Sequence, residues 1–345
     1  MTKIAIDAMG GDHAPKVPVL GAYQAAQAYP KHEFFLYGQE EQMRNILPGD
    51  KPSNLTYVHC EDVITNEDSP TFAVRRKRQA SMMQALKAVR QGRCDACISA
   101  GNSGALMVGG LTQVKTLRGV ERPAFLVQEP ALLAMERPLV FLDAGANVDS
   151  KVKHLWQNAV IGGAYTEAVF KIKKPRIGLL NNGREAKKGN QLAREAYEVL
   201  QADSQLNFIG NVEPHELFKN RCDVLVADGF QANMVLKSME GTASTIIQLL
   251  KKTIQEGSLA GKLGGLLLKA DLKKLAGVLD ANEAGAGLVF GLRAPVLKCH
   301  GDANEQAFKQ ACQQALQLLS SDLYGQLADI FKAHPLPESL EKEEE

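Results

Sequence analysis

The chain has 345 residues, 45% of them hydrophobic, which predicts a globular protein of one large or two modest domains. Its 40 lysine and arginine residues nearly balance 39 aspartate and glutamate residues, which argues against a nucleic-acid-binding protein with a strongly basic domain. No apolar run approaches the roughly 18 residues of a membrane span and no signal segment opens the chain, so we expect a cytoplasmic protein.

Short apolar runs alternate with amphipathic stretches, a pattern typical of α/β proteins whose largely parallel sheet is covered on both faces. The predicted strands are Lys3–Asp7, Glu33–Gly38, Leu55–His59, Ala96–Ser99, Leu139–Asp143, Arg176–Leu180 and Asp223–Ala227. Ligands of such folds bind where loops leave the carboxyl ends of the strands. Five glycine-rich or polar loops occupy such positions, so one crevice could collect all of them.

The first predicted strand leads into a glycine pair, two acids, a histidine and a helix-starting proline. Adjacent glycines let the backbone approach a ligand closely, and a helix start offers free N–H groups to negative charge. The residues of this expected anion site are Asp7, Gly10, Gly11, Asp12 and His13. Buried carboxylates at Asp7 and Asp12 would orient the loops.

Ser69 and Pro70 are typical of a helix start, and we predict one helix from there to Gly92. The run Arg75–Arg78 then puts four cations on one helix turn. Such a run is most often a solvated face. The functional alternative is a landing site for an acidic partner.

Six irregularly spaced cysteines predict reduced thiols rather than a disulfide framework. Cys94 and Cys97 have thioredoxin-like spacing but lead into a strand instead of opening a helix, so a structural role is favoured. No second ligand pair has the spacing of a zinc site, and we expect neither a metal nor another cofactor.

A second anion loop follows the strand Ala96–Ser99 and contains Gly101, Asn102, Ser103 and Gly104. It is neither a dinucleotide fingerprint nor a P-loop, and Ala105 stands where a nucleophile elbow has its last glycine. From the residues alone, helix capping and phosphate binding by Ser103 are equally open.

Three later loops supply further candidates. Asn147 follows the strand that ends at Asp143, and Asn181, Asn182, Arg184 and Lys188 follow the strand that ends at Leu180. Phosphate would find charge-assisted hydrogen bonds in the second of these loops, although the asparagines could simply shape the turn.

Asp228 ends a strand just before Asn233 and Lys237. Asp228 could position phosphate, orient a lysine or only cap the next helix. Lys298 and His300 stand two residues apart on a predicted strand and therefore face the same way. They could support the charge of a phosphate or of a departing thiolate.

The segment 242–279 alternates apolar and cationic residues at helical spacing, and glycines at 257, 261, 264 and 265 predict two helices. A basic amphipathic pair can lie on an anionic membrane, but packing in the core or at a dimer interface is slightly favoured. The acidic end of the chain predicts a frayed, solvated tail.

These motifs resemble those of the phosphate acyltransferase (PlsX) family over nearly the whole chain. The strings that carry the resemblance are Ile4–Pro15, Ser69–Lys77, Ile98–Met107, Leu142–Asp149 and Lys298–Gly301. The resemblance implies a three-layer α/β/α fold like that of isocitrate and isopropylmalate dehydrogenases, related to phosphotransacetylase. It predicts a single domain over residues 1–335 with a protruding helical pair at about 242–279, and a disordered tail at 336–345.

The resemblance further implies transfer of a long-chain acyl group from acyl carrier protein to inorganic phosphate, reversibly, giving acyl phosphate for phospholipid synthesis. In this interpretation Lys298 and His300 support charge and Asp228 orients. The expected ligands of phosphate or acyl phosphate are Asp7, Gly10, Gly11, Asp12, His13, Asn102, Ser103, Gly104, Asn147, Asn181, Asn182, Lys188 and Asn233. The resemblance also implies a homodimer, contact with the membrane surface and transfer of the acyl phosphate to a membrane glycerol-3-phosphate acyltransferase. No nucleic-acid partner is expected.

The chain departs from the family pattern at Pro214-His215, at Ala232 and over Ala281–Phe290, which concerns acyl binding more than the phosphate loops. Three other functions are alternatives. A metal-dependent dehydrogenase would need a carboxylate cluster and a nucleotide loop that the sequence lacks. A phosphotransacetylase acting on acetyl-coenzyme A shares the chemistry and differs in its donor. A non-catalytic sensor of acyl carrier protein would have kept the fold alone.

Overall fold

The computed structural model describes residues 1–47, 49–129, 138–278, 285–321 and 323–341. Within them a single sheet of 11 strands has the order β3-β2-β1-β4-β11-β10-β5-β6-β9-β7-β8. The strands are β1 (Lys3–Asp7), β2 (Glu33–Gly38), β3 (Leu55–His59), β4 (Ala96–Ser99), β5 (Ala124–Glu129), β6 (Leu139–Leu142), β7 (Arg176–Leu180), β8 (Asn207–Val212), β9 (Val224–Val226), β10 (Gly287–Phe290) and β11 (Val296–Lys298).

The predicted α/β fold with a largely parallel sheet is confirmed. β10 runs antiparallel to both of its neighbours and β5 is antiparallel to β6, whereas the other recorded strand pairs are parallel. Each predicted strand is present, although β6 and β9 are slightly shorter than expected. The sequence prediction missed β5, β8 and β10, and two of these form the antiparallel centre of the sheet.

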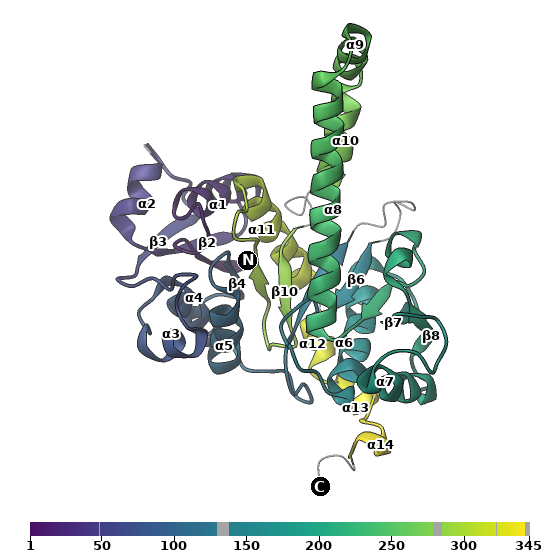
Figure 1. The fold of residues 1–345 in the computed structure, drawn as a ribbon. Helices are drawn as coiled ribbons and strands as arrows, with labels where there is room; N and C mark the ends of the chain where they lie inside the picture. The colour runs from purple at the N-terminus through teal and green to yellow at the C-terminus, as the bar shows by residue number, and fades with distance from the viewer. Residues whose placement is uncertain (48, 130–137, 279–284, 322, 342–345) are drawn as a thin grey trace.

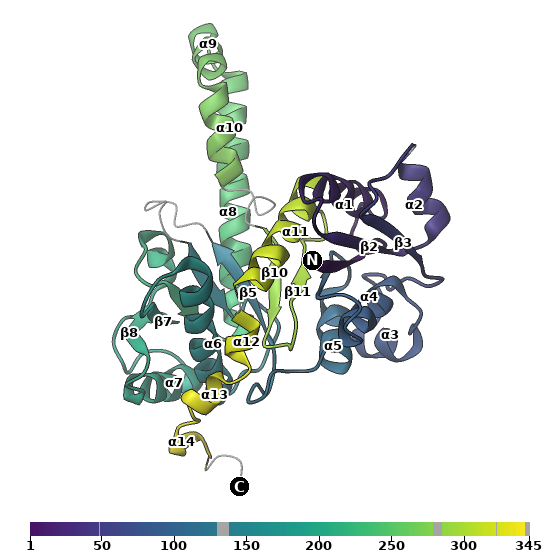
Figure 2. The same cartoon turned by 180° about the vertical axis from the view of Figure 1, so that it is seen from behind.

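Helices cover both faces of the sheet (Figures 1 and 2). They are α1 (Lys16–Ala28), α2 (Glu40–Ile46), α3 (Pro70–Arg76), α4 (Ser81–Arg90), α5 (Ser103–Gln113), α6 (Val152–Phe170), α7 (Gln191–Ala202), η1 (Pro214–Lys219), α8 (Gly229–Glu256), α9 (Leu259–Leu267), α10 (Lys269–Val278), α11 (Glu305–Ser320), α12 (Leu323–Leu327), α13 (Ile330–Ala333) and α14 (Glu338–Glu341). Apolar residues of α1, α6, α7, α11 and α12 pack in one core cluster, while α3, α4, α5 and the start of α8 pack in the clusters on the other face.

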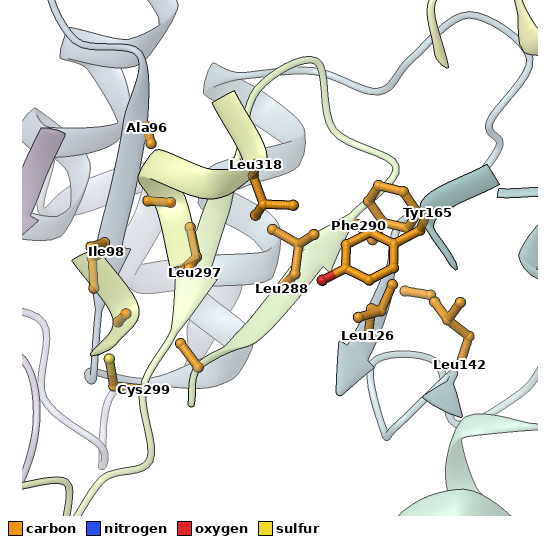
Figure 3. Packing of buried hydrophobic residues seen from close by; sticks show 14 of the residues in the cluster. Ala96, Ile98, Leu126, Leu142, Tyr165, Leu288, Phe290, Leu297, Cys299 and Leu318 are labelled. Atoms are coloured by element: carbon orange, nitrogen blue, oxygen red, sulfur yellow. The ribbon is translucent and has the colours of Figure 1, made fainter. Parts of the chain in front are cut away.

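The core is continuous across the middle of the sheet. Leu126, Leu288, Leu297 and Ile98 project to one face from four adjacent strands (Figure 3). Tyr165 of α6 packs edge-on against Phe290, with ring centroids 5.5 Å apart. Burial of these side chains joins the two halves of the sheet into one body.

The long helix α8 projects from this body and carries α9 and α10 at its far end (Figure 1). Only Gly229, Ala232 and Leu236 of α8 are buried, all near its start. The prediction of two helices over 242–279 is wrong, because α8, α9 and α10 share the described residues of this segment. One break falls at Gly257, whereas Gly264 and Gly265 lie inside α9. A Cβ at Gly265 would lie 2.2 Å from Ile254, so this glycine lets α9 pack closely against α8 instead of ending a helix.

The prediction of a single helix from Pro70 to Gly92 is wrong, because α3 ends at Arg76 and a separate helix, α4, begins at Ser81. Lys77 leaves the helix and its ammonium donates to Asp68 (2.7 Å) and to the Val63 carbonyl (2.9 Å). The four cations therefore do not share one helix turn. Arg75, Arg76 and Arg78 remain exposed.

The expected tail also differs in part, since residues 338–341 form α14 and Leu340 is 1% exposed within the main core. Residues 342–345 and Ala281 lie outside the described residues. All six cysteines are free, as predicted, and all are buried, which raises the pKa of Cys94 to about 11. In the part of the chain that the structure describes, no helix combines the length and apolarity needed to cross a bilayer.

A substitution at Gly21 would test the packing of α1 against α11. A Cβ at this position would lie 2.4 Å from Phe308 Cβ and 2.9 Å from the Glu305 carbonyl oxygen. We expect Gly21→Ala to lower the free energy of unfolding by about 1–3 kcal/mol, because overpacking forces the two helices apart. Chemical denaturation measures this.

The matched control is Gly163→Ala in α6, where the new Cβ would meet its nearest neighbours at 3.7 and 3.9 Å. A helical glycine replaced by alanine there should be neutral or stabilising by about 0.5–1 kcal/mol. Equal loss of stability in both variants would contradict the packing argument.

Candidate active-site cavity

A cavity of about 480 Å³ opens at the centre of the sheet, between the loops that follow β1, β4, β6 and β11 and one side of α8. The predicted residues that line it are Asp12, Ser103, Asn233, Lys298 and His300. The structure therefore brings together candidates that are up to about 290 positions apart in the sequence.

Asp7 holds the loops beneath the cavity and does not line it. Its carboxylate is 1% exposed and accepts hydrogen bonds from Ser81 Oγ (2.6 Å), Ser99 Oγ (2.7 Å) and the Met9 amide (3.2 Å). Burial raises the pKa of Asp7, and these hydrogen bonds oppose the rise by favouring the ionised form. Asp7 thus orients the loops by joining β1, α4 and β4, whereas the expectation that Asp12 is buried as well is wrong, because Asp12 is exposed.

Close backbone packing explains the first glycine pair. A Cβ at Gly10 would lie 2.5 Å from Asp7 Oδ2 and 2.6 Å from the Gly101 amide nitrogen. Gly11 has φ +107° and faces Ala100. The Asp12 amide donates to the Gly301 carbonyl (2.7 Å), so these loops form one edge of the cavity. His13 is exposed and is not among the lining residues.

In the loop after β4, different residues at the start of α5 are placed for helix capping and for phosphate binding, the two roles that the sequence left open for Ser103. Asn102 is the cap, because its Oδ1 accepts from the Ala105 amide (3.0 Å) while its Nδ2 donates to the carbonyls of Thr65 (3.2 Å) and Asp68 (3.0 Å). Ser103 is exposed at the first helical position and lines the cavity. Gly104 lies against Pro70 of α3 and is not a lining residue.

Lys298 supplies positive charge to this edge of the cavity. Its ammonium donates to the carbonyls of Ala100 (3.2 Å) and Cys299 (2.5 Å), and burial lowers its pKa. His300 lies at the rim, half exposed, with Nδ1 2.5 Å from Asp302 Oδ1. The helix start of α5, Ser103 and Lys298 together form a site suited to an anion.

The opposite edge is held by a second buried carboxylate, Asp143. It is 0% exposed and accepts from the amides of Phe125 (2.9 Å), Ala146 (2.8 Å) and Asn147 (2.8 Å). Asn147 Nδ2 donates to Asp143 Oδ2 (2.8 Å) and to the Pro123 carbonyl (2.9 Å), so both of its hydrogens have partners in the turn.

Asp228 caps the start of α8, which is one of the three roles that the sequence left open for it. It accepts from the amides of Phe230 (3.0 Å), Gln231 (3.4 Å) and Ser150 (3.1 Å) and does not line the cavity. Its contribution is to aim α8, which carries Asn233 to the cavity wall.

The expectation that one crevice collects every loop is wrong for the loop after β7. β9 and β6 lie between β7 and the cavity, and neither Asn181, Asn182 nor Lys188 lines it. Asn181 shapes the turn through the Lys188 carbonyl (3.1 Å) and the Asn182 amide (2.8 Å). Arg184 pairs with the carboxylate of Glu216, which is 1% exposed.

Sequence reasoning missed one wall of the cavity. Phe125, Val127 and Glu129 of β5 line it, facing Leu236 and Glu240 of α8. Burial, with a smaller contribution from the charge of Glu240, raises the pKa of Glu129 to about 7. The continuous apolar run over 124–127 was the available signal for this strand.

The model of a family described as "Fatty acid synthesis protein" matches residues 2–325. The phosphate acyltransferase of Ligilactobacillus salivarius is 44% identical over 96% of this chain and 99% of its own length. That of Streptococcus equi subsp. zooepidemicus is 46% identical (96% and 98%), and that of Bacillus anthracis 43% (97% and 99%).

Solved structures with the same fold include a phosphotransacetylase from Streptococcus pyogenes, with a TM-score of 0.57 at 17% identity, covering 92% of this chain and 94% of that one. A branched-chain phosphotransacylase from Enterococcus faecalis gives a TM-score of 0.53 at 14% identity, covering 92% and 98%. The expected relation to the phosphotransacetylase fold is confirmed.

Glu129 predicts a pH-dependent stability. Its carboxyl group ionises near pH 4.5 in the unfolded chain and near 7 in the native protein, so the native state binds the extra proton and stability falls as pH rises between these values. We expect Glu129→Gln to stabilise the protein by about 1–3 kcal/mol at pH 8 and by nothing below about pH 5. Thermal melting across this range measures the difference.

The control is Glu198→Gln on the exposed side of α7, which should melt like the unmodified protein at every pH. A stabilisation by Glu129→Gln that persisted at pH 4 would exclude ionisation as its cause.

Proposed function

The chain belongs to the fatty acid synthesis protein family, whose relatives named above are phosphate acyltransferases, and we propose that its central cavity is where an acyl group is joined to phosphate. The protein is an acyltransferase of fatty acid and phospholipid synthesis. The observation that carries the proposal is the anion site formed by Lys298, Ser103 and the start of α5, in the same cavity as the apolar side chains of Phe125, Val127 and Leu236.

In the proposed reaction the acyl donor is a thioester and phosphate binds between Lys298 and the first turn of α5. A phosphate oxygen attacks the thioester carbonyl carbon, and the carbon–sulfur bond of the tetrahedral intermediate then breaks. The thiol, whose pKa is about 8.5, leaves with the proton that monohydrogen phosphate brought, so acyl phosphate and free thiol are the products. Backbone N–H groups of α5 and the Lys298 ammonium would stabilise the oxyanion.

The proposed donor is a long-chain acyl group on acyl carrier protein, an acidic partner. Arg75, Arg76 and Arg78 are exposed on and just after α3, and the Arg76 guanidinium lies 5.7 Å from the ring centroid of Phe72, which is 60% exposed. α3 starts against Gly104, next to the cavity residue Ser103. This position and charge support docking of the carrier beside the cavity.

We also propose a homodimer that contacts the membrane surface and hands its product to a membrane glycerol-3-phosphate acyltransferase. Supporting this, Leu263, Leu266 and Leu267 at the end of the projecting helices are 63%, 66% and 83% exposed beside Lys262. An apolar groove runs along α8 beside η1 and includes Met239. Clusters of exposed apolar side chains such as these are typical of surfaces that bind a protein or a membrane.

The activity test mixes the protein with inorganic phosphate and palmitoyl thioesters of acyl carrier protein or coenzyme A, with acetyl-coenzyme A as a third donor in parallel. We expect phosphate-dependent release of the carrier thiol together with stoichiometric acyl phosphate. Lys298→Ala should lower kcat/KM for phosphate by about 100-fold, because the removed ammonium stabilises both phosphate and the oxyanion. No release with either donor would favour the sensor function, and use of acetyl-coenzyme A alone would favour a phosphotransacetylase.

The docking surface is tested by Arg75→Glu combined with Arg78→Glu. We expect kcat/KM for the carrier-protein donor to fall by about tenfold or more at low salt, with less difference at high salt, because attraction between the partners is screened. Turnover of the coenzyme A thioester should stay unchanged. Lys31→Glu, an exposed charge reversal on the loop before β2, is the control. Equal loss with both donors would place the effect in the site and not in docking.

A further inference from the structure

Gly287 leaves a gap in the floor of the cavity, at the centre of the sheet. Gly287 pairs with Lys298 on β11, and the register of Leu288 with Leu126 places Val127 beside Gly287 on the other side. Residues in register on neighbouring strands point to the same face. Val127, Gly287 and Lys298 therefore form one row facing the cavity, and its middle member has no side chain.

This glycine is not required by the backbone or by packing. Its φ lies outside the left-handed region, and a Cβ would meet Val127 Cγ1 at 3.5 Å, the Leu126 carbonyl oxygen at 3.7 Å and the Lys298 carbonyl oxygen at 3.8 Å. These are ordinary contacts, unlike those at Gly10. A glycine inside a strand costs stability and often marks a close approach by a ligand.

The chemistry of the cavity changes across the same gap. On the β11 side lie Lys298 and Ser103, which carry the anion site. On the β5 side the apolar side chains of Phe125, Val127 and Leu236 line the cavity, together with the polar residues Gln128, Glu129, Lys237 and Glu240. A ligand with a polar reacting end and a hydrocarbon chain fits this order if it crosses β10 at Gly287.

We propose that the first part of the acyl chain lies across Gly287, with its carbonyl near Lys298 and its methylenes against Val127 and Leu236, so that residue 287 determines which acyl groups are accepted. This inference rests on the proposed function, and names where its acyl substrate binds. The missing side chain keeps the path from the anion site to the apolar wall open.

The test replaces Gly287 by Ala, Val and Leu and compares acetyl, octanoyl and palmitoyl thioesters of one carrier protein. With Gly287→Leu we expect kcat/KM for palmitoyl and octanoyl donors to fall about 10–200-fold and that for acetyl by less than about threefold, with Ala and Val intermediate. Melting temperatures should stay close to that of the unmodified protein. Gly163→Leu, outside the cavity, should change neither donor preference nor rate.

If Gly287→Leu lowered kcat/KM equally for all three donors, the carrier's arm or the thioester would lie at Gly287 and the proposal would be overturned. Unchanged kcat/KM for all three donors would also overturn it. A binding measurement separates this inference from the proposed reaction. Gly287→Cys adds a thiol that faces the cavity, whereas the six native thiols are buried. We expect palmitoyl-coenzyme A, but not acetyl-coenzyme A, to protect it from maleimide, even where no acyl phosphate forms. Equal protection by both would overturn the proposal.

Discussion

The direction of β10 is the constraint on which the arrangement of the molecule depends. β10 joins β11 to β5, and it runs against both. Its first residues therefore lie at the edge of the sheet where β4, β11 and β5 end. The loops after β4 and β11 leave the sheet at that edge, whereas the loop after β6 leaves at the opposite edge because β6 is antiparallel to β5. The cavity is lined by residues of all three loops, with the anion site on the β11 side and Phe125, Val127 and Leu236 on the β5 side.

Two buried carboxylates fix the edges of that cavity. Asp143 follows β6 and accepts several hydrogen bonds from the loop that comes next, whereas Asp7 ends β1 and accepts one from its own loop and two from the hydroxyl groups of Ser81 and Ser99. Burying a carboxylate is unfavourable unless such donors surround it, so the geometry of each loop is tied to the stability of the protein. The ligand then meets a preorganised surface.

Much of the fold could be predicted from the sequence, because buried parallel strands are continuous apolar runs between turn residues. β10 could not, since it has only four residues and owes its conformation to pairing with β11 and with β5, which is far away in the sequence. The break between α3 and α4 depends on Lys77 reaching back to Asp68, which no local pattern displays.

The sequence identified residues that lie in or near the cavity more reliably than it identified what each side chain does there. Lys298, His300, Ser103, Asp12 and Asn233 do meet, whereas Asn102, Asn147 and Asp228 use their side chains to hold loops and helix starts. Asparagine and aspartate suit both tasks equally, so only the positions of their partners distinguish a ligand from a cap.

The late position of β10 and β11 in the chain also bears on synthesis at the ribosome. β1 to β9 emerge first, and until residues 287–298 follow, β4 and β5 each present an unpaired edge in what will be the middle of the sheet. Unpaired edges are templates for joining other chains. The nascent protein is therefore most exposed to aggregation just before its last two strands are added, and its central gap closes only when nearly the whole polypeptide has been made.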